Sequence, residues 1–111
     1  MVKVADADKE EYELTIIDPG FQRWFVGNGR PINYHSPDFY AGWNQRYVQQ
    51  WNQLATQQIS SSPDYPFQNQ IDYDANIDYG VELDHELYWY FRYIEAMYGA
   101  RYNFGFGRRN L

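Results

Sequence analysis

The chain contains no cysteine, which excludes a disulfide framework, a thiol nucleophile and a zinc site with cysteine ligands. Positive charge is also scarce, because 9 Lys and Arg oppose 15 Asp and Glu and leave a formal net charge of −6. Nucleic acids and anionic membrane surfaces attract basic proteins, so we expect neither as a partner. The sequence has no apolar run long enough to cross a bilayer, so we expect no transmembrane segment.

Aromatic residues, in contrast, are abundant. They make up 21% of the 111 residues, with 12 Tyr, 7 Phe and 4 Trp. A chain of this length fits one domain with a modest core. Because each aromatic side chain buries a large area, such a domain needs few aliphatic residues to be stable. The composition, 44% hydrophobic and 22% charged, is typical of a globular protein.

The N-terminal part of the chain predicts a strand followed by a short helix. Residues 1–10 are polar and acidic, and we expect them to form a flexible segment ahead of the fold. Apolar and polar residues alternate over residues 12–16, which predicts a half-buried strand. Asp18 suits the N-cap of a helix and Pro19 its first position. The glycines at 27–29 predict the end of that helix.

Two longer helices are expected further along the chain. Ser36 and Pro37 predict the start of a helix that ends near Gln57. Its large apolar residues step by three and four along one stripe that we expect to be buried: Tyr40, Trp43, Tyr47, Trp51 and Leu54. Residues 84–98 predict a second helix, apolar on nearly all sides and therefore central. The alternation over residues 102–106 predicts a last strand that pairs with the first.

Together these elements predict a single α+β domain over residues 11–107, with a C-terminal tail at 108–111. Two longer helices and one short helix would pack on a small sheet of two or three strands. Residues 65–71 are ambiguous and are expected to hold at most a short strand.

An acidic loop ahead of the last helix is the most distinctive motif. Its oxygen-bearing side chains occupy alternate positions and are followed by a glutamate: Asp72, Asp74, Asn76, Asp78 and Glu82. This spacing is similar to the start of an EF-hand calcium loop. However, the EF-hand glycine would fall on Ile77 and its bidentate glutamate on Leu83. The motif is therefore no EF-hand, but another loop geometry would still allow these five residues to bind calcium.

Two further interpretations of the acidic loop stay open. In the first, Asp72 and Asp74 end a strand, Asn76 and Asp78 make Asx turns, and Gly80 supplies a positive φ. In the second, arginines neutralise the loop in a structural network. The candidate arginines are Arg46, Arg92 and Arg101.

Catalytic patterns are weak in this sequence. The two histidines, His35 and His85, lack the spacing of helical zinc ligands. Asp18, Glu82 and Glu86 are candidates for an acid–base pair, but nothing in the sequence brings them together. No nucleophile, phosphate-loop or cofactor motif is present. We therefore expect no catalytic residues, no cofactor other than calcium, and a protein that is not an enzyme.

Surface aromatic residues suggest a different activity. Exposed Trp and Tyr side chains form flat platforms for sugar rings or protein partners. Trp89 and Tyr88 lie on the back of the last predicted helix and are the candidates for such a platform. A carbohydrate-binding module is therefore one alternative, and the calcium-stabilised domain is the other.

Several motifs in combination carry a resemblance to a known family. They are Ile16-Ile17-Asp18-Pro19-Gly20-Phe21, Trp43-Asn44-x-Arg46-Tyr47-Val48, Ile71-Asp72-Tyr73-Asp74, Ile77-Asp78-Tyr79-Gly80-Val81-Glu82-Leu83 and Leu87-Tyr88-x-Tyr90-Phe91. The chain resembles an uncharacterised family of short Bacteroidetes proteins of unknown function. Members often begin with a lipoprotein-type signal, which implies a domain tethered in the cell envelope or periplasm, with the cytoplasm as the alternative location.

The leading functional expectation is a non-catalytic binding or structural module associated with the envelope. Its partner would be an unknown protein or glycan. The resemblance assigns no activity, so it transfers no catalytic residue to this chain.

Overall fold

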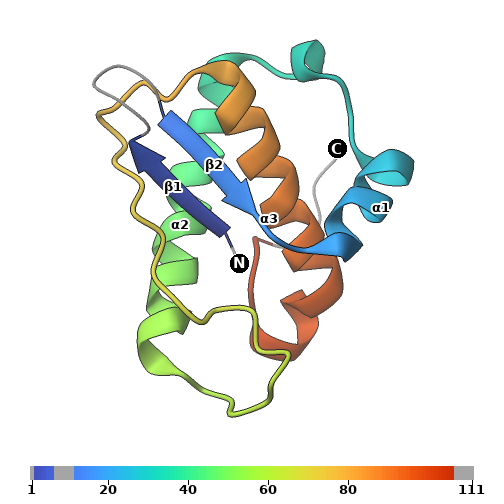
Figure 1. Cartoon of the computed structure of the whole chain (residues 1–111), viewed down its shortest axis with the longest axis vertical. Helices are drawn as coiled ribbons and strands as arrows, with labels where there is room; N and C mark the ends of the chain where they lie inside the picture. The colour runs from blue at the N-terminus through green and yellow to red at the C-terminus, as the bar shows by residue number, and fades with distance from the viewer. Residues whose placement is uncertain (1, 7–11, 107–111) are drawn as a thin grey trace.

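The computed structural model describes residues 2–6 and 12–106, and two long helices dominate it. Helix α2 spans Pro37–Gln57 and helix α3 spans Val81–Tyr102. Both helices run from top to bottom in Figure 1, so residues 58–80 must return along the fold to connect them. The two helices pack directly against each other.

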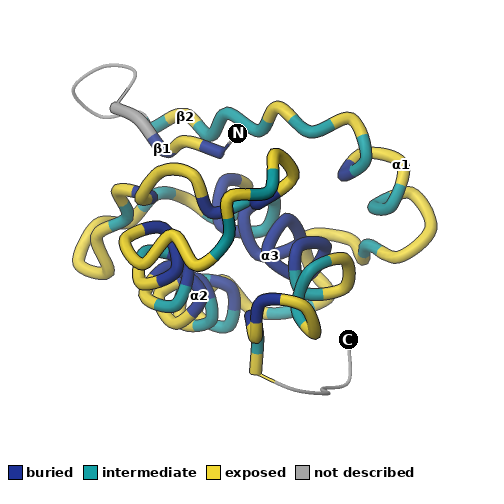
Figure 2. The backbone as a smooth tube through the Cα atoms, turned by 90° about the horizontal axis from the view of Figure 1, so that it is seen from below, coloured by how far each residue is buried: buried dark blue, intermediate teal, exposed yellow. Residues whose placement is uncertain are grey.

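A two-stranded sheet covers the opposite side of α3. Strands β1 (Val2–Asp6) and β2 (Tyr12–Ile16) are antiparallel, with Val2 opposite Ile16. Figure 2 shows the order of the layers, with the sheet on one side of α3 and α2 on the other. Helix α1 (Pro19–Asn28) also packs on α3, and a short 3₁₀ helix, η1 (Ile32–Tyr34), follows it. The predicted α+β class and the single small domain are confirmed.

The helix starts follow the capping residues that the sequence predicts. The Asp18 carboxylate accepts a hydrogen bond from the Gly20 N–H at 3.0 Å. The Ser36 hydroxyl oxygen accepts one from the Phe39 N–H at 3.1 Å. Each bond satisfies a backbone donor that has no partner inside its helix, which is why these residues fix where α1 and α2 begin.

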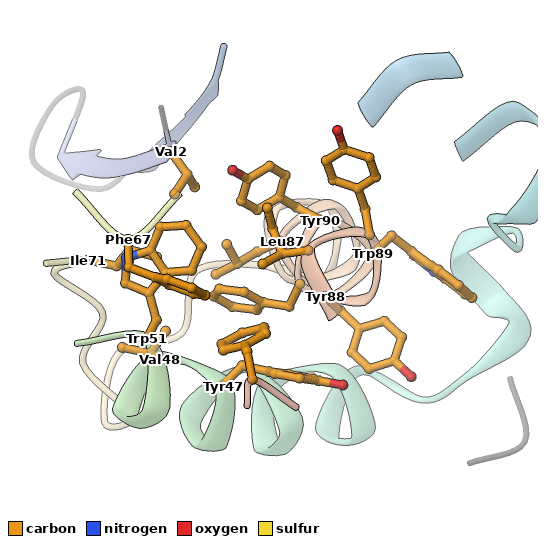
Figure 3. Packing of buried hydrophobic residues seen from close by; sticks show 14 of the residues in the cluster. Val2, Tyr47, Val48, Trp51, Phe67, Ile71, Leu87, Tyr88, Trp89 and Tyr90 are labelled. Atoms are coloured by element: carbon orange, nitrogen blue, oxygen red, sulfur yellow. The ribbon is translucent and has the colours of Figure 1, made fainter. Parts of the chain in front are cut away.

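The core is built around α3, as its all-round apolar character predicts. Leu87, Tyr88, Trp89 and Phe91 have no exposed surface. Figure 3 shows these neighbours leaving α3 in different directions, with Tyr88 toward α2 and Tyr90 on the side of β1. A helix surrounded in this way needs partners on every face, and α1, α2 and the sheet provide them. None of the described helices combines the length and apolar character needed to cross a membrane.

The N-terminal segment is one point where the structure corrects the sequence analysis. We expected residues 1–10 to be flexible, but Val2–Asp6 forms strand β1. Val2 and Val4 are both buried, so burial of these two valines ties the segment to the core. Residues 7–10 of that predicted segment, and the predicted tail at 108–111, lie outside the described residues.

The predicted C-terminal strand is also wrong. Helix α3 continues through Gly99 to Tyr102 and ends at Asn103, whose φ of 58° is left-handed. Phe104 then turns back and is buried against Phe67, with ring centroids 5.1 Å apart. The aromatic alternation over 102–106 therefore reflects packing beneath the helices and not strand pairing.

Residues 65–71 form no strand in the structure. The Asn52 side chain of α2 takes the place of a strand partner. Its amide nitrogen donates to the Ile71 carbonyl at 3.0 Å, and its oxygen accepts from the Ile71 N–H at 2.7 Å. With its backbone groups satisfied by a side chain, this part of the loop needs no neighbouring strand.

Candidate functional site

The acidic loop makes local turn interactions. Asp74 accepts a hydrogen bond from the Asn76 N–H at 2.9 Å, and Asp78 accepts one from the Gly80 N–H at 3.0 Å. Gly80 has a φ of 90°, a conformation that favours glycine. The Tyr79 hydroxyl accepts from the Asp74 N–H at 2.8 Å. The Asx-turn interpretation is therefore right for Asp78 and Gly80, but the other turn belongs to Asp74 where Asn76 was expected, and residues 71–74 form no strand.

Neither of the other interpretations of the loop gains support. Within residues 2–6 and 12–106, no three His, Cys, Asp or Glu residues gather as a metal site would require. No contact of the described residues supports calcium binding by Asp72, Asp74, Asn76, Asp78 and Glu82.

The arginine network is wrong for two of its three members. Arg92 pairs with Glu95 and Arg101 pairs with Asp64, each at 3.0 Å. The guanidinium of the third, Arg46, lies 4.8 Å from the ring centroid of Trp43.

Trp89 and Tyr88 are not the exposed platform that we expected. Both side chains have no exposed surface. Trp24 from α1 packs on Trp89 with ring centroids 6.3 Å apart, and Phe39 from α2 packs on Tyr88 at 5.5 Å. Helices α1 and α2 thus cover the side of α3 that carries Trp89 and Tyr88. The periodicity of α3 alone does not predict these long-range contacts. In this structure the two residues offer no face to a sugar.

The three carboxylates considered for acid–base chemistry do not share a site. Glu82 and Glu86 line one hollow, beside His85, whose Nε2 lies 2.7 Å from the Arg30 carbonyl. Asp18 lines a different cleft. The structure therefore brings Glu82 and Glu86 to one hollow and leaves Asp18 apart from them.

A buried polar group links the acidic loop to both long helices. The Asn44 amide donates to the Asp84 carbonyl at 2.9 Å and to Asp84 Oδ1 at 3.2 Å. The Tyr73 hydroxyl donates to the same Oδ1 at 2.8 Å. Burial raises the pKa of Asp84, although the hydrogen bonds from Tyr73 and Asn44 oppose that rise. This network holds the loop in place, and its side chains line none of the hollows described here.

One cleft lies between α3, the start of β1 and residues 64–69. It has a volume of about 340 Å³, at the lower end of the usual range for small-ligand sites. We call it the Tyr90 cleft. Its lining residues are Val2, Asp18, Trp51, Asp64, Tyr65, Pro66, Gln68, Asn69, Tyr90 and Tyr98.

Tyr90 itself is the least expected part of this cleft. Only 3% of the residue is exposed, yet its hydroxyl has no hydrogen-bond partner among the residues that the structure describes. Figure 3 shows the ring leaving α3 on the side of Val2, which also lines the cleft. Buried hydroxyls nearly always have a partner. A ligand or a bound water in the cleft is therefore the natural partner for Tyr90.

Asp18 brings a carboxylate to the same cleft through a close approach of α1 to α3. Besides capping α1, its Oδ1 accepts a hydrogen bond from the Tyr93 hydroxyl at 3.2 Å. Gly20 makes room for this contact, because a Cβ there would lie 2.6 Å from the Tyr93 hydroxyl oxygen. A side chain at position 20 would therefore separate Tyr93 from Asp18.

The negative charge of Asp18 affects the pKa values of three tyrosines. Burial raises the pKa of Tyr90, of Tyr93 and of Tyr98, and the negative charge of Asp18 raises each of them further. For Tyr93 the pKa rises to about 12. All three hydroxyls therefore stay protonated at neutral pH and are able to donate as well as accept hydrogen bonds.

The opposite wall of the cleft is held by satisfied hydrogen bonds. The Trp51 indole N–H donates to the Asn69 carbonyl at 2.9 Å. The Tyr65 hydroxyl donates to the Leu54 carbonyl at 2.7 Å. These bonds fix residues 64–69 against α2, so the cleft has a rigid side facing Tyr90 and Asp18.

Sequence reasoning missed most of this site. Asp18 was identified as a helix cap and as one of three candidate acid–base carboxylates, and Tyr90 only as part of an apolar face. The one available signal was the pair Tyr90 and Tyr93, which places two hydroxyls a single helical turn apart on α3.

Comparison with known proteins gives a family and no function. Residues 1–106 match the sequence model of a family described as a family of unknown function, DUF6146. No curated protein and no solved structure matches the chain.

Proposed function

The chain belongs to this family of unknown function, DUF6146, and we propose that it is a non-catalytic binding module whose ligand site is the Tyr90 cleft. The observation that carries this proposal is Tyr90, a residue only 3% exposed whose hydroxyl has no partner among the described residues and which lines the same cleft as Asp18. Natural proteins are often less stable than they could be at functional sites, because polar groups there have no partner until a ligand binds.

The groups that line this cleft suit ligand binding better than catalysis. Its lining contains no histidine, lysine or arginine, and its tyrosines remain neutral phenols at neutral pH. A neutral phenol with a raised pKa is a poor general base, because the best catalytic pKa lies near the operating pH. The Asp18 carboxylate is already engaged in capping α1 and in holding Tyr93. These groups are suited to orienting a ligand.

The cellular setting of the module is part of the proposal. We place it in the cell envelope, on the resemblance to Bacteroidetes proteins with lipoprotein-type signals. A tether would have to join the fold ahead of Val2, since that side chain is already buried in the core. Fractionation of cells that produce the native gene product tests this, and recovery in the cytoplasmic fraction alone would contradict it.

Ligand binding is tested by a thermal-shift screen of the full chain. The panel should contain amines, amino acids, neutral sugars, carboxylates and short peptides. A ligand that binds only the folded state raises stability, by about 2.7 kcal/mol at a hundredfold excess over Kd. We expect at least one class to raise the melting temperature of the wild type and to lose that effect in Tyr90→Phe.

The matched control is Ile32→Ala, which changes the separate hollow beside His85 and leaves the Tyr90 cleft intact. A true cleft ligand should stabilise this variant as it does the wild type. If no compound acts, or if every active compound stabilises Tyr90→Phe equally, the cleft is not a ligand site. Turnover in a hydrolase screen that disappears in Asp18→Ala would contradict the non-catalytic part of the proposal.

A further inference from the structure

The ligand class of the Tyr90 cleft follows from its charge, and this inference rests on the proposed function. We infer that the cleft binds an organic cation, meaning a ligand that presents a primary ammonium or a guanidinium group to Asp18 and Tyr90.

The first argument is the charge of the lining. Two carboxylates, Asp18 and Asp64, line the cleft, and no basic residue does. Arg101 pairs with Asp64 at 3.0 Å, where both side chains are about half exposed. Asp18, which is partly buried, forms no ion pair within the described part of the chain. A cationic ligand would supply the counter-charge that this carboxylate lacks and would form charge-assisted hydrogen bonds with it.

The second argument is the set of free acceptors. Asp18 Oδ1 already accepts from the Gly20 N–H and the Tyr93 hydroxyl. Its Oδ2 has no donor among residues 2–6 and 12–106, and neither has the Tyr90 hydroxyl oxygen. An ammonium group carries three donors and no acceptor, and a guanidinium carries five donors. Such a group is complementary to a site in which acceptors remain unused.

The third argument is the aromatic surround. Tyr90 and Tyr98 both line the cleft and provide ring faces, which attract cations through their quadrupole. The field of Asp18 extends over both, since its charge adds to the effect of burial in raising the pKa of each. An anionic ligand would meet this negative field directly, and a neutral ligand would leave Asp18 without a counter-charge.

A second acidic hollow offers a useful contrast. Glu82 and Glu86 line the hollow beside His85, together with apolar side chains. The lining of that hollow includes the imidazole of His85, whereas the lining of the Tyr90 cleft contains no histidine, lysine or arginine.

Isothermal titration of the full chain tests the inference. The cationic probes are agmatine and 1,5-diaminopentane, and a lysine with blocked α-amino and carboxyl groups represents a peptide side chain. Glucose and 1-pentanol are the neutral probes. We expect saturable binding of at least one cation, weakened about tenfold or more by Asp18→Asn. Preference for blocked lysine over the free amines would identify a peptide as the source of the cation, and the reverse order a small molecule.

Two variants keep the result interpretable. Asparagine caps helices as well as aspartate does, so Asp18→Asn should fold and lose only the charge. Asp38→Asn is the matched control, because it removes one negative charge from an exposed position in the first turn of α2, away from the cleft. Cation binding should be unchanged in this control. Equal weakening in both variants would show a general charge effect and overturn the inference.

The remaining outcomes separate this inference from the proposed function. If a neutral probe binds, is lost in Tyr90→Phe and is unaffected by Asp18→Asn, the cleft is a ligand site but the cation assignment is wrong. If no probe of either charge binds in a way that depends on Tyr90, both the cation assignment and the ligand site are overturned.

Discussion

Two tyrosine hydroxyls in the wall of the Tyr90 cleft should differ sharply in their value to the fold. Tyr65 is 2% exposed and its hydroxyl donates to the Leu54 carbonyl at 2.7 Å. Tyr90 is 3% exposed and its hydroxyl has no partner among the described residues. Replacing each by phenylalanine is the same chemical change at nearly the same burial, so the pair isolates the hydrogen bond.

The magnitudes follow from these partners. The net contribution of one intramolecular hydrogen bond is about 0.5–1.5 kcal/mol. The Leu54 carbonyl still accepts from the Gln58 N–H at 3.1 Å after the change, so it is not left unsatisfied. We therefore expect Tyr65→Phe to lower the free energy of unfolding by about 1 kcal/mol. At about 2.1 cal/mol/K of unfolding entropy per residue, that is a fall of about 4 °C in melting temperature for this chain. Tyr90→Phe should stay within about 0.5 kcal/mol of the wild type.

Urea unfolding followed by tryptophan fluorescence measures both values, with thermal melts as a second readout. The m-values should agree among the three proteins, because the surface exposed on unfolding is the same. Equal destabilisation by the two substitutions would refute the reasoning. It would mean that the Tyr90 hydroxyl has a stabilising partner in the folded protein and is not available to a ligand.

Three further predictions concern ionisation and metal. Burial raises the pKa of Asp84 above the usual 3.8. The protonated side chain therefore stabilises the folded state fully below pH 3.8, and this stabilisation is lost as the pH rises through the pKa of the folded protein. Asp84→Asn should therefore be more stable than the wild type at pH 7 in urea unfolding, and this difference should vanish toward pH 4. The pKa of Tyr93 rises to about 12 from 10.0, so unfolding free energy should fall between pH 10 and 12, and by less in Asp18→Asn. Since the Asp74 and Asp78 carboxylates already bind backbone N–H groups, melting temperatures in EDTA and in millimolar calcium should be equal, and a rise abolished by Asp74→Asn would contradict this.

The parts of the fold that sequence predicts well are those fixed by nearby residues. Asp18 and Ser36 cap α1 and α2 as expected, because a cap depends only on the next two or three backbone N–H groups. The central place of α3 was also predictable, since a helix apolar on all sides has no face to leave in water. Both inferences need no knowledge of distant parts of the chain.

The errors arise where a short pattern fits two environments. Val2 and Val4 alternate with polar residues, as in a strand, but five residues of an acidic segment carried too weak a signal. The aromatic residues over 102–106 also alternate, yet Phe104 packs on Phe67 after the end of a helix. Period-two spacing correctly marks Val2, Val4 and Phe104 as buried, but it does not predict the backbone that buries them, and it fails for Phe106, which is exposed.

The cleft could not be predicted because it depends on contacts across the chain. Asp18 and Tyr93 are 75 residues apart in sequence and meet only when α1 folds onto α3. The partnerless hydroxyl of Tyr90 is likewise a property of the assembled fold, since periodicity predicts only that Tyr90 is buried.

The identity of residue 18 separates the structural requirement from the functional one. A cap needs an oxygen acceptor, and asparagine provides it as well as aspartate does. The contact with the Tyr93 hydroxyl also needs only an acceptor. Neither role requires a negative charge, and Asp18 has no counter-charge among the described residues. The N-terminus of α1 favours a negative charge at Asp18, and a cation in the Tyr90 cleft would add the counter-charge that the described residues do not supply.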